Sequence, residues 1–310
     1  MATSERDAQL QHLTDWFRGF AEHAPSELYR RLSPAVIDAP DVMALLLEAA
    51  PVQQLPMLLF AAVHAEVLAR GIPYPQDGPA FVEFCREHAE TLRPTLRRRS
   101  TQTNEVGRCA YLRPCIAAAA DGRPLALIEV GASAGLNLNM DRYAYDFGGG
   151  VTGGDPASPL TIGTDLRRGT PPLELPPVGW RTGIDLSPAP DPDWLRACVF
   201  ADQPERLARL DAALAIAREH PPALVQGDAL GVLPQVLGRV PEGMQAVVFH
   251  TAVTVYLTED QQRRLTALVA GVTHVTAERG RPEGGYALEV DGRDVGAAHP
   301  HGAWLDWTAA

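Results

Sequence analysis

The chain has 310 residues, enough for one large domain or two small ones with a sizeable core. Hydrophobic residues make up 46% and charged residues 21% of it, a composition typical of a globular protein. The formal net charge of -11 disfavours nucleic acid and anionic membrane surfaces as partners, because binding to polyanions needs clustered cations.

All 27 basic side chains are arginines, and the absence of lysine excludes several enzyme classes. Pyridoxal-phosphate enzymes, lysine-dependent aldolases, Walker A nucleotidases and protein kinases each need a lysine amine at a defined place. Four cysteines without a CxxC spacing predict reduced thiols, and the first residues lack the basic and apolar regions of a signal peptide. The longest apolar run, 56–63, is far shorter than the roughly 20 residues that span a bilayer. We therefore expect a cytoplasmic protein.

The first part of the chain carries helix patterns, with apolar residues at three- and four-residue spacing. Prolines at likely first-turn positions and Gly71 at a likely C-terminus add to the signal. No strand is predicted there, so residues 1–120 are expected to form a helical domain. The helices are predicted over 7–23, 26–32, 41–49, 56–70, 79–92 and 104–119.

From residue 121 to residue 310 short apolar runs alternate with helix-like stretches. This alternation predicts parallel strands joined by right-handed crossovers, and the last two runs are expected to form an antiparallel hairpin across 281–285. Residues 142–180, rich in glycine and proline, are an expected insertion with a ribbon and a loop. The strands are predicted over 125–130, 182–186, 223–226, 246–250, 272–277 and 286–290, and the helices over 194–219, 229–238 and 259–270.

The first strand runs into a turn of small residues that is expected to lead into a helix. Small residues let a ligand approach the backbone, and ligands bind at the carboxyl ends of parallel strands. Glu129, Gly131, Ser133 and Gly135 fill the pattern acidic-x-Gly-x-small-x-Gly in order. The segment resembles motif I of the S-adenosylmethionine-dependent methyltransferases.

That resemblance assigns expected cofactor contacts. Glu129 would belong to the cofactor site, and the backbone of the turn, at Gly131, Ala132, Ser133 and Gly135, would hold the methionine portion of S-adenosylmethionine. Asp185, at the end of the next strand, would bind the ribose hydroxyls, and Asp228, at the end of the third, would lie near the adenine. Asp185 lies further from the turn than is usual, and the insertion would account for the difference.

The same turn allows other interpretations. It satisfies G-x-S-x-G, the nucleophile elbow of α/β-hydrolases, with Ser133 followed by Asp228 and then His250 or His299. The helical character of the preceding chain disfavours this, because such hydrolases place several strands before the serine. A dinucleotide site is weaker, since G-x-G-x-x-G is not met. A tight turn without a ligand also remains open.

Several further segments, 103–108, 129–137, 181–185, 227–228 and 301–304, extend the resemblance over nearly the full length. By them the chain is similar to a bacterial family of unknown function, DUF2332, whose members look like methyltransferases. The resemblance implies a methyltransferase-type fold and assigns no reaction.

Polar residues near the predicted crevice are candidates for substrate contacts. Asn104, Glu105 and Arg108 would share one helical face before the first strand, with a solvated face and a Glu105–Arg108 pair as the alternative. His250 ends the fourth strand, where methyltransferases place residues that face the transferable methyl, unless it is simply a buried histidine. Tyr256 would line the pocket or pack against the next helix. No metal site is predicted, because no third ligand accompanies His299 and His301.

Taken together, the sequence predicts an α/β protein: a Rossmann-like sheet of the class I methyltransferase type, with the N-terminal helical domain across its active-site mouth. The expected reaction is methyl transfer from S-adenosylmethionine to an oxygen or nitrogen of a small molecule. His250, or alternatively Glu105, would act as the base, and Asn104, Arg108 and Tyr256 would contact the substrate. The alternatives are a serine hydrolase that uses Ser133, and a methyltransferase-like fold with a binding or non-methylating role.

Overall fold

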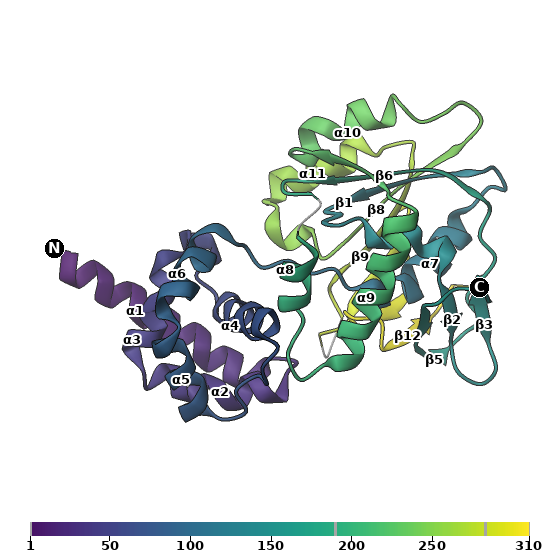
Figure 1. Ribbon diagram of the computed structural model, residues 1–310. Coiled ribbons are helices and arrows are strands. Elements are labelled where there is room, and N and C mark those ends of the chain that lie inside the picture. Colours follow the sequence, from purple (N-terminus) through teal and green to yellow (C-terminus); the bar gives the residue numbers. More distant parts are fainter. Residues whose placement is uncertain (1, 189–190, 282–283, 310) are drawn as a thin grey trace. The chain divides into compact units, whose positions relative to one another are not determined.

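The computed structural model describes residues 2–188, 191–281 and 284–309. The chain forms two compact units (Figure 1). The first comprises Met1–Thr103 and Asp191–Ala208, and the second comprises Asn104–Pro190 and Arg209–Ala310. This division places residues 104–120, predicted as the end of the helical domain, with the sheet.

The elements described in the first unit are helical, as predicted for this part of the chain. Pro56 at the first position and Gly71, at a φ of +64°, set the ends of the helix predicted over 56–70, which is confirmed. The single helix predicted over 79–92 is wrong, because the chain breaks at His88 and starts a second helix. The helices are α1 (Ala2–His23), α2 (Glu27–Ile37), α3 (Pro40–Met43), η1 (Ala44–Glu48), η2 (Pro51–Gln53), α4 (Pro56–Arg70), α5 (Gly78–Glu87), α6 (Ala89–Arg98) and α8 (Pro192–Ala197).

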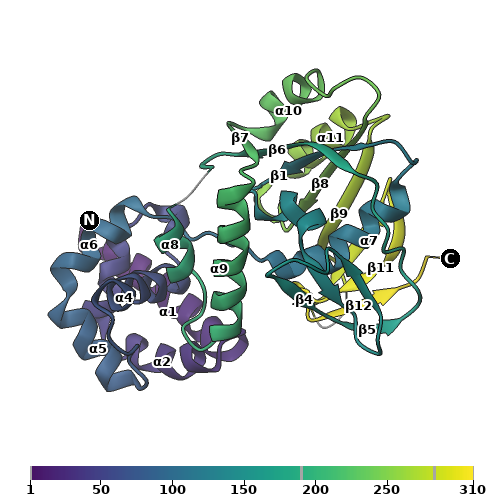
Figure 2. The ribbon, with the colours of Figure 1, turned by 45° about the vertical axis from the view of Figure 1, so that its right-hand side comes forward.

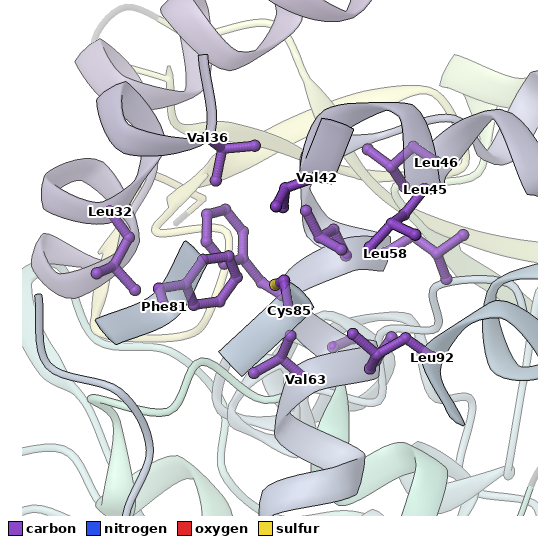
Figure 3. Close-up of a cluster of buried hydrophobic side chains, with 14 of the residues drawn as sticks. Leu32, Val36, Val42, Leu45, Leu46, Leu58, Val63, Phe81, Cys85 and Leu92 are labelled. Atoms are coloured by element: carbon purple, nitrogen blue, oxygen red, sulfur yellow. The ribbon is translucent and has the colours of Figure 1, made fainter. Parts of the chain in front are cut away.

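One buried apolar cluster holds the helical unit together (Figure 3). Phe60 lies at its centre and stacks on Tyr29 with ring centroids 4.3 Å apart. The later segment of this unit, Asp191–Ala208, joins the same cluster through Trp194. The indole nitrogen of Trp194 donates to the carbonyl of Ser100 at 2.8 Å. His64 binds the carbonyl of Val199 at 3.0 Å. Residues from two distant parts of the sequence therefore share one core.

The second unit is built on a mixed sheet of nine strands in the order β5-β12-β11-β10-β9-β8-β1-β6-β7. The strands β7, β6, β1, β8 and β9 are parallel, whereas β10, β11 and β12 follow as an antiparallel meander. The predicted hairpin at 281–285 joins β9 to β10, although its residues 282–283 lie outside the described residues. The strands are β1 (Leu125–Val130), β5 (Asp165–Arg168), β6 (Val178–Asp185), β7 (Ala223–Gln226), β8 (Gln245–Thr251), β9 (Thr273–Arg279), β10 (Tyr286–Val290), β11 (Arg293–Ala298) and β12 (Trp304–Trp307).

Helices cover both faces of this sheet (Figure 2). Ile128 and Val248 pack against Leu233 and Leu265, which belong to α10 (Ala229–Leu237) and α11 (Glu259–Leu268). On the other face, α7 (Cys109–Ala119) contacts β9 and β10. Since successive strand residues point to opposite faces, neighbouring residues of β1 and β8 enter different environments.

The insertion forms a separate small sheet of three strands in the order β3-β2-β4. Its strands are β2 (Ala144–Asp146), β3 (Thr152–Gly154) and β4 (Thr161–Gly163). Tyr143 and Tyr145 are fully buried, and their hydroxyls donate to the carbonyls of Leu136 and Met140. The tyrosines therefore belong to the packed core of the ribbon.

Two helix predictions in and near the sheet unit are wrong, and a third differs from the structure at its start. The stretch 194–219 divides into α8 and α9 (Pro204–Glu219), and Pro204 starts the second helix. After the glycine turn the chain forms the short 3-10 segment η4 (Leu136–Arg142), with a kink at Asn139, in place of a regular helix. The segment predicted as 104–119 is helical from η3 (Val106–Arg108) onward and continues as α7.

Candidate functional site

The glycine turn follows β1 directly and requires unusual backbone geometry. Gly131, Ser133 and Gly135 have φ values of +74°, +50° and +69°. A Cβ on Gly131 would lie 2.7 Å from Cγ2 of Val253, and one on Gly135 would lie 2.8 Å from Cγ of Pro222. Both glycines are therefore required by conformation and by close packing. Ser133 is a strained position of the kind found at functional sites.

Two side chains hold the turn in place. The Asp185 carboxylate accepts from the backbone N–H of Ser133 at 2.8 Å through Oδ2 and from that of Ser187 at 2.8 Å through Oδ1. The Asn104 amide donates to the Ser133 hydroxyl at 2.5 Å and accepts from the N–H of Ala134 at 3.1 Å. The structure thus brings three predicted site residues, Asn104, Ser133 and Asp185, into direct contact.

Glu129 lies at the end of β1 on the face that α7 covers. Its side chain is 3% exposed, and Oε1 accepts from the amide of Asn137 at 2.8 Å. Burial raises the pKa of this carboxyl to about 8, although the Asn137 hydrogen bond and the charge of Arg108 act in the opposite direction. Oε2 has no hydrogen-bond partner among the described residues. Glu129 is therefore largely protonated at neutral pH.

Glu105 and Arg108 contact different elements and do not share a helical face with Asn104, so that prediction is wrong. Glu105 precedes η3, accepts from the N–H of Gly107 at 2.9 Å, and pairs with Arg209 at 3.0 Å. Arg108 is buried, and its Nη1 donates to the hydroxyl of Thr251 at 2.7 Å. Glu105 precedes η3 and Arg108 ends it, so the residues before α7 turn toward separate partners.

His250 lies on the opposite face of β8 from Thr251 and is 2% exposed. Its Nδ1 lies 2.7 Å from Oε1 of Glu278 on β9. The Glu278 carboxylate also accepts from the N–H of Val253 at 2.9 Å and from the hydroxyl of Thr254 at 2.8 Å. Burial alone would raise the pKa of Glu278, but the hydrogen bonds to the carboxylate, that of His250 first, lower it. An ionised Glu278 makes Nδ1 of His250 the proton donor, and in the neutral imidazole Nε2 is then the acceptor.

The remaining predicted residues lie apart from these contacts. Asp228 caps α10 by accepting from the N–H of Leu230 at 3.1 Å. Tyr256 is 84% exposed in η5 (Thr254–Tyr256). His299 and His301 occupy the turn between β11 and β12, and their rings lie 5.6 Å apart. Within the described ranges, no cluster of three His, Cys, Asp or Glu side chains is arranged to hold a metal ion.

Glu278 and Arg209 are the partners that sequence reasoning missed. Glu278 is an acidic residue inside a predicted strand, and its spacing places it on the same face as its neighbours Thr276 and His274. This alternation along the strand was the signal that could have identified Glu278 as a residue on the His274 face. The partner of Glu105 lies on a distant helix, and no local pattern identifies Arg209.

In the part of the chain that the structure describes, no helix combines the length and apolar character that a bilayer crossing requires. Neither the curated proteins nor the solved structures contain a match to the chain. A family described as "Uncharacterized protein conserved in bacteria (DUF2332)" matches residues 14–307. Since the match spans nearly the whole chain, the protein belongs to the DUF2332 family.

Proposed function

We propose that the protein is an S-adenosylmethionine-dependent methyltransferase that acts on an oxygen or nitrogen of a small molecule. The observation that supports this proposal most strongly is the position of the glycine turn in the sheet. The chain passes from β1 to β6 on one side and later places β8 on the other side of β1. Strand order therefore reverses beside β1, and in open α/β sheets ligands bind at the carboxyl ends of the strands at such a point. The parallel order favours the Rossmann-like sheet of class I methyltransferases.

The residues at this edge fit an adenosine group. A carboxylate offers about four lone-pair positions. Asp185 is partly exposed and uses two of them for Ser133 and Ser187, so it retains capacity for ribose hydroxyls. Leu186, which follows it, is 72% exposed and offers an apolar surface for a planar base. Asp228 follows the adjacent strand β7 and caps α10, at the position where the motif I resemblance places an acid near the adenine.

S-adenosylmethionine would supply an electrophilic methyl group, and the chain would bind, orient and deprotonate. The glycine turn lets the ligand approach the backbone, and Asp185 would fix the ribose. His250 is a better candidate base than Glu105. With Nδ1 held by Glu278, Nε2 is the acceptor of the neutral imidazole, whereas the Glu105 carboxylate is engaged by Arg209 and by the N–H of Gly107.

The contacts disfavour the serine hydrolase alternative. A nucleophile needs a base within hydrogen-bond reach that a third group orients. The Ser133 hydroxyl instead accepts from Asn104, while His250 binds Glu278 and Asp228 caps a helix. In the triad that uses His250, the three groups therefore have separate partners.

We expect S-adenosylhomocysteine to bind and to stabilise the fold. A ligand at a hundredfold excess over its dissociation constant adds about 2.7 kcal/mol to the free energy of unfolding. Thermal unfolding across an S-adenosylhomocysteine titration measures this, with adenosine and homocysteine as separate controls. An unchanged unfolding temperature in well-folded protein would contradict the proposal.

The same protein tested with a fluorophosphonate probe separates the two enzyme classes. Ser133→Ala should leave S-adenosylhomocysteine affinity within a few-fold, and the probe should not label Ser133. In a hydrolase, the probe would label Ser133 and the substitution would remove at least about a thousandfold of the rate.

A further inference from the structure

A cavity of about 920 Å³ lies on the sheet face that carries His250, and nothing in the motif I resemblance assigns it a role. Strands β8 to β11 form its floor, and α11 with the following loop forms one wall. Register places His250, Thr276, Glu289 and Asp294 in one row across four adjacent strands. All four line the cavity, so its floor is a polar row with a buried histidine at one end.

At the histidine end of the row, hydrogen bonds orient the imidazole. Glu278 holds Nδ1 of His250, which directs Nε2 away from that carboxylate. Gln262 of α11 donates to the carbonyl of Thr254 at 3.0 Å, and the hydroxyl of Thr254 donates to Glu278. The pair of His250 and Glu278 is therefore held by contacts from β9, from the loop at Thr254 and from α11. A catalytic base needs a further group of this kind to orient it.

A second imidazole adjoins the first. The ring of His274 lies 5.1 Å from that of His250 and also lines the cavity. Burial, together with the nearby His250, lowers the pKa of His274 to about 4, so it stays neutral at physiological pH. Its Nε2 has no hydrogen-bond partner among the described residues.

The loop after β8, which contains Ala252 and Val253, contacts both a residue that lines the cavity and the glycine turn. The N–H of Val253 donates to Glu278 in the cavity, and the Val253 side chain packs against Gly131. Ala252 beside it has a φ of +54°, which is strained for a residue with a Cβ. Val253 therefore contacts both a residue that lines the cavity and the glycine turn.

The charges around the cavity favour a cation. Its lining carries four carboxylates and two guanidinium groups, and Arg281 pairs with Asp294. A compound with a protonated amine would gain from the excess of negative charge. The charged lining residues are Glu278, Arg279, Arg281, Glu289, Asp291 and Asp294.

We infer that this cavity is the acceptor site, and that it takes a small amino alcohol whose hydroxyl oxygen receives the methyl group; this rests on the proposed function. The hydroxyl proton passes to Nε2 of His250 as the new oxygen–carbon bond forms. The methyl carbon–sulfur bond breaks with its electron pair on sulfur, which leaves a neutral thioether. Glu278 is a positioning residue, and Glu289 contributes charge toward the ammonium group.

Binding is tested by following the His250 imidazole in ¹H–¹⁵N spectra, assigned with His250→Gln. The probes are valinol, 2-hydroxyisovalerate and 3-methylbutane-1,2-diol, which match in size and differ in charge. Valinol should shift the His250 signals, and the hydroxy acid should not. Glu289→Gln should weaken valinol binding about tenfold, and Glu242→Gln, an exposed control, should not. Equal binding of all three probes, or no shift with any, would overturn the inference.

The same spectra test the positioning role of Glu278. In the parent, the neutral His250 imidazole should be protonated at Nδ1 and not at Nε2, and Glu278→Leu, which leaves no acceptor for Nδ1, should abolish that preference. An Nε2-protonated parent would overturn the role. S-adenosylhomocysteine binding without a valinol response would contradict the cavity inference alone. A valinol response without S-adenosylhomocysteine binding would remove the methyl-transfer function and with it the acceptor role.

Discussion

Asp185→Ala is expected to weaken the binding of S-adenosylhomocysteine by about tenfold to a hundredfold. Hydrogen bonds to a charged group contribute roughly 1.5–3 kcal/mol, and about 1.4 kcal/mol corresponds to a factor of ten. Asp185 ends β6 beside the glycine turn and keeps lone pairs available to ribose hydroxyls. Isothermal titration calorimetry measures the change.

The variant also removes the acceptor for the N–H of Ser133, so a second substitution separates the two effects. Asp185→Asn keeps an acceptor oxygen for the turn and loses the charge, and it should still weaken binding. Asp77→Ala is the matched control, because Asp77 likewise accepts from a backbone N–H, that of Ala80, at a helix start in the helical unit. Unchanged affinity in both Asp185 variants would show that another group holds the ligand.

Glu129→Gln is expected to reduce, by a few kcal/mol, the loss of unfolding free energy between pH 5.5 and pH 8. Burial raises the pKa of Glu129 from 4.5 to about 8, so the folded state retains a proton that the unfolded state loses between these values. The free energy of unfolding of the parent should therefore fall as pH rises through this window, at up to about 1.4 kcal/mol per pH unit from this group. Glutamine keeps the oxygen that accepts from Asn137 and carries no titrating proton.

Chemical denaturation at pH 5.5 and at pH 8 gives the comparison. The other titrating groups are common to both proteins, so the difference between their slopes isolates Glu129. The parent should lose more stability than the variant over this interval. Equal slopes would mean that Glu129 is already ionised in the folded state at pH 5.5.

Local signals predicted several elements with their bounds. Strands β1, β7 and β10 agree with the apolar runs 125–130, 223–226 and 286–290, because each is a short run bounded by turn residues. Strand β11 was missed. It contains Gly296, where a Cβ would overlap the carbonyl oxygen of Asp306 on β12. The close approach of the two backbones requires a glycine, and glycine has a low strand propensity, so the local sequence did not indicate a strand.

The sequence predicted the position of a site residue where the order of the strands along the chain was enough to place it. The ends of parallel strands meet at one edge, which correctly placed Asp185 beside the turn. Asn104 was assigned to a helical face, yet it contacts the turn from an irregular segment before η3. Glu278 depended on the pairing of β8 with β9, which sets His250 opposite Thr276. Long-range register of this kind is not encoded in any local pattern.

The most direct test of the account is a crystal structure of the protein grown with saturating S-adenosylhomocysteine. We expect ligand density at the carboxyl end of β1, with the ribose hydroxyls within hydrogen-bond distance of the Asp185 carboxylate and the sulfur on the side of Val253. Density at any other place, or a turn without ligand under conditions that saturate the protein in solution, would contradict it.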